Sequence, residues 1–158
     1  MKTRLRVVPD TNVVLASMRT TSLQSPNREV FTRWMNDECQ ILISDDTLAE
    51  YAEKLIAHGF SSEKISEFLT LIEFAAEHIE IDHFHLPIYP ADTDDIAFLL
   101  CAVNGNATHL VSYDGHLLTL QQSYSFRICM PISFLQELRE ISISEPPIFS
   151  SPSSPQQQ

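Results

Sequence analysis

The stretch VVPDTNVVLAS (residues 7–17) joins a short apolar run to a helix-like segment through a single acid. The run LRVVP (5–9) is typical of a buried strand, and Asp10 follows it at once. Thr11 and Asn12 come next, and residues of these types favour helix starts. One Asp at such a point is usually a helix cap, so its meaning depends on whether other acids reach the same place.

The chain after this stretch repeats the alternation of strands and helices. Further strand signals lie at 39–44, 78–82, 109–112 and 126–131. Helical spacing of apolar residues predicts helices at 44–60, 61–79, 94–104 and 131–141. We therefore expect an α/β fold, a three-layer α/β/α sandwich around a mostly parallel sheet. In such sheets ligands bind beyond the carboxyl ends of the strands.

Length and composition predict one domain without a membrane segment. The 158 residues, 44% of them apolar, suffice for one core, which we place in residues 1–141. Residues 142–158 are rich in Pro, Ser and Gln, which predicts a disordered tail. No apolar stretch or leader pattern indicates a membrane or an export signal, so we expect a soluble, cytoplasmic protein.

The cysteines and the charge distribution exclude some classes of protein. Cys39, Cys101 and Cys129 are widely spaced in apolar surroundings, which predicts buried thiols rather than a disulfide framework or a zinc knuckle. The net charge of −11 argues against coating nucleic acid by bulk attraction. However, the first 36 residues carry +4 and the remainder −15, so a locally basic edge is possible.

Four acids are expected at one rim of the sheet, and they are Asp10, Glu50, Asp95 and Asp114. Each follows a strand or lies in the helix after one, with Asp92 and Asp94 as close competitors for the place of Asp95. Several carboxylates in a low-dielectric cleft repel one another unless a cation offsets their charge. Oxygen ligands favour Mg²⁺ or Mn²⁺, which can lower the pKa of a bound water and stabilise a leaving oxygen.

Simpler interpretations remain open for each residue alone. Asp10 and Asp92 can be helix caps, Glu50 a solvated helix residue, and Ser112 a strand-end filler. A phosphatase or dehalogenase would also place an Asp after the first strand, but it needs a second acid where this chain has Asn12. His83 and His85 could serve a zinc site, although a surface loop is the simpler interpretation.

Together, the motifs VVPDTNVVLAS, LAEYAEKL, DTDDIAFLLCA and LVSYDGHLL resemble those of the PIN-domain nucleases. The similarity spans residues 4–135 and is strongest to the PIN-family (VapC-like) toxin components of bacterial toxin–antitoxin systems. Departures from the family pattern are Pro9 at the strand end, and Ile96 and His116 where this subgroup often has further acids.

The resemblance implies a Mg²⁺- or Mn²⁺-dependent endoribonuclease. Its catalytic, metal-binding acids would be Asp10, Glu50, Asp95 and Asp114, and its polar supports Asn12, Ser112 and Asp92. It further implies an RNA substrate, a small antitoxin protein as partner, and a homodimer. The alternative is a non-catalytic PIN-like module that binds RNA or protein.

Overall fold

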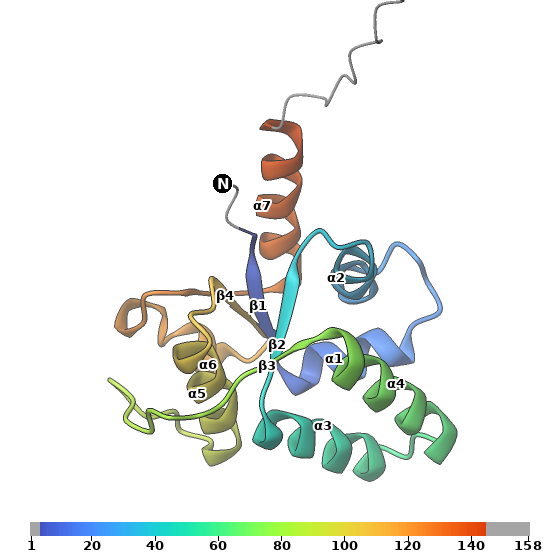
Figure 1. The fold of residues 1–158 in the computed structure, drawn as a ribbon, viewed down its shortest axis with the longest axis horizontal. Coiled ribbons are helices and arrows are strands. Elements are labelled where there is room, and N and C mark those ends of the chain that lie inside the picture. Colours follow the sequence, from blue (N-terminus) through green and yellow to red (C-terminus); the bar gives the residue numbers. More distant parts are fainter. Residues whose placement is uncertain (1–3, 145–158) are drawn as a thin grey trace, which may run out of the picture.

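Residues 4–144, which the computed structural model describes, form a five-stranded parallel sheet with helices on both sides (Figure 1). The strands lie in the order β3-β2-β1-β4-β5, and every pairing is parallel. They are β1 (Arg6–Pro9), β2 (Gln40–Ile43), β3 (Glu77–His78), β4 (His109–Val111) and β5 (Arg127–Cys129). The predicted three-layer α/β/α sandwich is confirmed.

The helices form the outer layers (Figure 1). One side carries α1 (Thr11–Arg19), α2 (Pro26–Met35), α3 (Asp45–Ala57) and α4 (Ser62–Ala75), and the other carries α5 (Ile96–Asn104) and α6 (Gly115–Leu118). The last helix, α7 (Pro131–Ser144), extends past the amino end of the sheet, and 3₁₀ turns occur at Thr93–Asp95 and Gln121–Ser123. Because α3 contacts both α1 and α5, it borders the carboxyl end of the sheet.

The core lies where the central strands meet the helices. Val7 and Val8 of β1, Ile41 and Leu42 of β2, and Leu110 of β4 are all fully buried. Parallel strands covered on both faces have continuous apolar sequences, which is why they could be recognised without a structure. The three cysteines are free and buried, as expected.

Several boundaries differ from the predicted ones. The strand expected at 78–82 stops at His78, because β2 ends at Ile43 and offers no further partner. The helix α2 was not predicted, although Pro26 stands at its first position, where proline favours helix starts. The helix α7 continues to Ser144, and the rest of the tail predicted for 142–158 lies outside the described residues.

Side-chain hydrogen bonds hold the loop between β3 and the turn at Thr93–Asp95. Asn104 Oδ1 accepts from the N–H groups of Asp82 and His83, and its Nδ2 donates to the His83 carbonyl. Farther along, the Tyr124 hydroxyl donates to the Ile88 carbonyl at 2.7 Å. The loop therefore reaches the carboxyl end of the sheet along a fixed path.

The edge strand β5 is capped by one side chain. Gln121 donates from Nε2 to the Phe126 carbonyl and accepts the Ile128 N–H at Oε1. A carboxamide thereby occupies the positions that a sixth strand would use.

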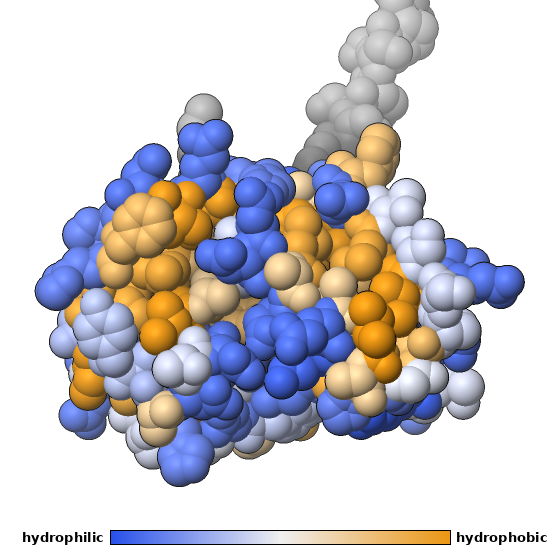
Figure 2. Space-filling model, turned by 90° about the horizontal axis from the view of Figure 1, so that it is seen from below, coloured by the Kyte–Doolittle hydropathy of each residue, from blue (hydrophilic) through white to orange (hydrophobic). Residues whose placement is uncertain are grey.

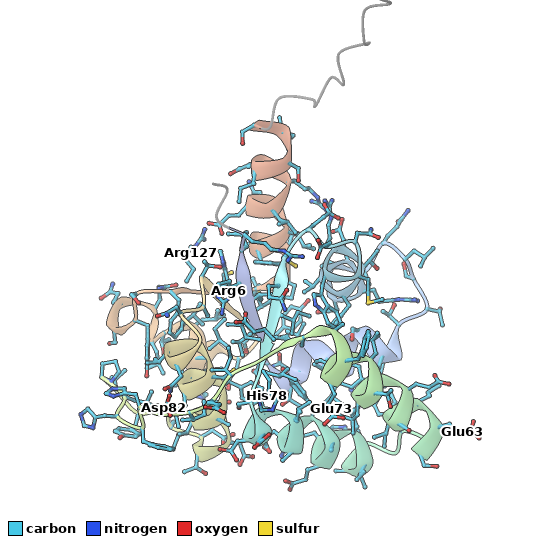
Figure 3. All side chains as sticks on the ribbon, in the orientation of Figure 1. Arg6, Glu63, Glu73, His78, Asp82 and Arg127 are labelled. Carbon is cyan, nitrogen blue, oxygen red and sulfur yellow. The ribbon has the colours of Figure 1, made fainter. Side chains whose placement is uncertain are left out.

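Ionisable side chains lie at both ends of the sheet (Figure 3). Arg6 and Arg127 lie toward the amino end, and His78 lies toward the carboxyl end, where its Nε2 is 2.9 Å from Asp45 at the start of α3. Among residues 4–144 no helix has the length and apolarity needed to cross a membrane.

Substituting Gly105, the C-cap of α5, tests the packing between this helix and β2. A Cβ there would lie 2.8 Å from Leu42 Cδ1 and 2.9 Å from the Cys101 carbonyl oxygen. We expect Gly105→Ala to lower the free energy of unfolding by about 1–3 kcal/mol, measured by urea denaturation. The control is Gly115→Ala, whose added Cβ meets no atom within 4 Å. Equal stability of the two variants would contradict the close packing.

Candidate active site

Asp10 is the deepest acid at the carboxyl end of the sheet. It is 5% exposed and stands between β1 and α1, where its N–H donates to the Val111 carbonyl. Its Oδ1 accepts from the Thr11 N–H at 2.8 Å, and its Oδ2 accepts from the Ser112 hydroxyl at 2.6 Å. Burial raises the pKa of Asp10 above its usual value, although these two hydrogen bonds lower it. The carboxylate is thus fixed in direction.

Ser112 links the ends of β1 and β4. Besides donating to Asp10, its hydroxyl accepts from the Asp114 N–H at 2.9 Å. Asn12 contacts the same turn, since its Nδ2 lies 3.4 Å from Ser112 Oγ and its Oδ1 accepts from the Tyr113 N–H. The turn after β4 is therefore tied to the turn after β1.

Asp95 is buried among the other acids. It occupies the N-cap position of α5 but makes no capping hydrogen bond, and it is 6% exposed. Its Oδ2 is buried without a hydrogen-bond partner among the described residues. Burial raises the pKa of Asp95 to about 7, and the nearby charges of Asp10, Asp114 and Asp92 add to the shift. A buried, unpartnered carboxylate oxygen costs free energy unless a proton or a cation satisfies it.

Asp92 and Asp114 complete an inner group of four acids with Asp10 and Asp95. Asp92 accepts from the Asp94 N–H and Asp114 accepts from the His116 N–H, so each caps a short helix with one oxygen. Both charges act on Asp10 and on Asp95. The capping interpretation is therefore true of these residues and does not conflict with a role in a site.

Glu50 lies apart from this inner group. Burial raises the pKa of Glu50, the charge of Asp94 adds to this shift, and the charge of Lys54 opposes it. Lys54 Nζ is 3.3 Å from Asp94 Oδ2. Glu50, Asp94 and Lys54 thus form an outer group.

One cavity connects the two groups. It has a volume of about 250 Å³ and is bordered by both sets of acids together with Thr11, Asn12, Leu15, Lys54, His58 and Phe98. Seen from this end of the molecule, hydrophilic side chains gather over the middle, with apolar side chains on either side (Figure 2). The predicted acids and Asn12 therefore border a common cavity.

The position of α3 over this cavity depends on Tyr51. Its side chain is fully buried, and its hydroxyl donates to the Pro9 carbonyl, one residue before Asp10. The last registered pair between β1 and β2 is Val7 with Ile41, which agrees with a proline at position 9 that has no N–H to extend this ladder. The Tyr51 contact also holds the neighbouring Glu50 at the cavity.

The structure places the predicted acids around one cavity, but sequence reasoning missed other residues that border it. Asp95 faces the inner group, whereas its competitor Asp94 faces Lys54. Lys54 and His58 were not singled out, although they follow Glu50 at intervals of four residues on the same helix. His83 and His85 belong to the loop held by Asn104.

The donor set of the inner group fits a divalent cation. Among residues 4–144 no group of three or more His, Cys, Asp or Glu side chains is placed so that it could hold a metal ion as it stands. However, the charges of Asp92 and Asp114 act on both Asp10 and Asp95, and one buried oxygen of Asp95 has no hydrogen-bond partner among the described residues. Hard cations such as Mg²⁺ and Mn²⁺ take such oxygen ligands.

A protein family and one solved structure with a TM-score above 0.5 agree with this fold. The PIN domain family matches residues 6–116 of the chain. The structure of VapBC2 from Rickettsia felis, bound to a DNA fragment from their promoter, is similar with a TM-score of 0.53 and 15% identity over 78% of this chain and 97% of that one. The T. brucei RRP44 PIN domain gives a TM-score of 0.49 and 16% identity over 89% of this chain and 85% of that one. No curated protein matches the sequence.

The shifted pKa of Asp95 predicts a pH-dependent stability in metal-free buffer. The unfolded chain releases this proton near pH 3.8, whereas the folded protein retains it to about pH 7. Stability therefore falls as the pH rises through this window, because the folded state binds more protons. We expect the unfolding free energy of Asp95→Asn, compared with that of wild type, to increase by up to about 4 kcal/mol between the low and the high end of this pH window. Urea denaturation in the presence of EDTA measures the difference.

The matched control is Asp82→Asn, which removes an exposed carboxylate on the loop outside the cavity. Its stability difference from wild type over the same pH range is the baseline for Asp95→Asn. If Asp95→Asn does not depart from this baseline, Asp95 ionises normally and the inner group is not coupled.

Proposed function

The chain belongs to the PIN-domain family, whose members are typically nucleases, and from this premise we propose that it is a divalent-metal-dependent endoribonuclease. The observation that carries the proposal is the buried, unpartnered Asp95 oxygen facing Asp10 and Asp114. Such an arrangement is unfavourable for the free protein and becomes favourable when a cation is bound. This is the behaviour expected of a metal-binding catalytic centre.

We assign the metal to the inner group. Asp10, Asp95 and Asp114 would hold Mg²⁺ or Mn²⁺, with Asp92 beside them. When bound, the ion supplies charge stabilisation at the phosphate and a lower pKa for the attacking water. Ser112 and Asn12 keep the Asp10 carboxylate and the β4 turn in register, so that these oxygens face the cavity.

Glu50 contributes from the opposite wall of the cavity. Its pKa is raised by burial and by Asp94, which makes its carboxylate a better proton acceptor than an exposed one. We therefore assign Glu50 the task of orienting the attacking water and accepting its proton. Hydrolysis then leaves the phosphate on one RNA fragment and a free hydroxyl on the other.

We further propose that the protein is the toxin of a cytoplasmic toxin–antitoxin pair and acts as a homodimer. The sequence motifs support this role by their resemblance to PIN-family toxins, and the likeness in fold to the VapBC2 structure is consistent with it. A small antitoxin protein would then be its partner, and RNA its substrate.

Calorimetric titration with Mg²⁺ or Mn²⁺ tests the assigned ligands. We expect Asp114→Asn to weaken metal affinity at least about tenfold, because it removes a carboxylate from the inner group. Stability in metal-free buffer should stay equal or rise slightly, since Asn also caps helices and repulsion is relieved. Asp46→Asn, an exposed change outside the cavity, is the control. Absence of binding by wild type would instead favour a non-catalytic binding module.

Cleavage of single-stranded RNA tests the activity itself. Wild type should cleave with Mg²⁺ or Mn²⁺ and lose activity in EDTA, and Asp10→Asn should reduce the rate at least about 100-fold. Folding of the variant is checked by its thermal unfolding curve, and Asp46→Asn again serves as the control. Equal cleavage by wild type and Asp10→Asn in all buffers would refute the assignment.

A further inference from the structure

The wall of the cavity formed by α3 changes from acidic to basic along its length. Glu50, Lys54 and His58 follow one another at intervals of four residues, and all three border the cavity. Each interval advances about 6 Å along a helix axis, so the side chains form a row on one face. The row leads from the acids toward the end of α3.

Arg19 extends this row from α1. Its guanidinium lies 2.7 Å from His58 Nδ1 and 5.9 Å from the centre of the Phe60 ring. Because a guanidinium can only donate, Nδ1 is the acceptor in this contact. His58 therefore lies directly beside the positive charge of Arg19.

Among residues 4–144, no carboxylate forms an ion pair with Arg19. In the described part of the chain, ion pairs with acids engage Arg4, Arg6, Arg33, Lys54, Arg127 and Arg139. Arg19 forms no such pair there and contacts His58 instead. Among the described residues, its positive charge beside the cavity therefore has no acidic partner.

Lys54 has a partner that it can exchange. Its pair with Asp94 spans 3.3 Å, and the two side chains are 37% and 51% exposed. Ion pairs this exposed are weak, so the ammonium group can turn to a stronger anion. A phosphate oxygen at the cavity would be such an anion.

We propose that Arg19, Lys54 and His58, here called the basic wall, bind the sugar-phosphate backbone of the substrate RNA beside the bond that is cleaved. The proposal rests on the proposed ribonuclease function, because it takes RNA as the ligand. A protein of net charge −11 with six acids around its cavity repels a polyanion. Cations next to those acids offset this repulsion and fix the direction of the strand across the site.

Binding measurements on a protein that does not cleave test the basic wall. A labelled single-stranded RNA is titrated, by fluorescence anisotropy in EDTA at several NaCl concentrations, with Asp10→Asn protein alone or carrying Lys54→Gln or Arg19→Gln. Each added substitution should raise Kd about fivefold and reduce the slope of log K against log salt by about 0.7. Thermal unfolding verifies that each variant folds.

Lys64→Gln in the same background is the matched control, since it removes an equal charge from an exposed position on α4 outside the cavity. Its Kd and salt slope should stay close to those of Asp10→Asn alone. Equal Kd values and salt slopes for all three added substitutions, or no RNA binding by any of the proteins, would overturn the proposal that the basic wall binds RNA. If wild type fails to cleave RNA but the basic-wall variants bind it more weakly, the proposed activity is wrong and the proposal that the basic wall binds RNA is supported.

Discussion

The structure depends on the hydrogen bond between the Ser112 hydroxyl and the buried Asp10 carboxylate. This bond requires β1 and β4 to be paired in parallel with Pro9 opposite Val111, because only then do the two turns leave the sheet side by side. A slip in that register would place Asp10 in the core without a partner, at a cost of several kcal/mol. The pairing that stabilises the centre of the sheet is thus the pairing that assembles the acids.

A second constraint fixes the opposite wall of the cavity. The Tyr51 hydroxyl satisfies the Pro9 carbonyl at the strand end, so α3 cannot move without leaving a buried acceptor unpaired. Glu50 precedes Tyr51 on α3, and Lys54 follows Tyr51 by about one turn. The hydrogen bond from Tyr51 to the Pro9 carbonyl therefore positions both side chains. The acids on the strand turns and the groups on α3 are therefore positioned by different parts of the same strand end.

Much of this arrangement could be predicted from the sequence. Continuous apolar runs revealed the central strands, and acids directly after them indicated the site, because the carboxyl ends of parallel strands share one rim. The division between inner and outer acids could not be predicted, since it depends on whether Asp94 or Asp95 turns inward at the start of α5. The length of β3 was overestimated because it is set by where β2 ends, which the sequence of β3 does not reveal. Beyond that point Asn104, rather than a strand, accepts the hydrogen bond from the Asp82 N–H.

The side chain of Gln121 has a consequence for how the protein can associate. By occupying the Phe126 carbonyl and the Ile128 N–H, it leaves β5 without the free backbone groups that strand addition requires at these two positions. Extended peptides and copies of the same chain are thereby kept from lengthening the sheet at this edge. Any partner that docks at this edge must then be held by side chains rather than by the backbone of β5, and side chains determine which partner is accepted there.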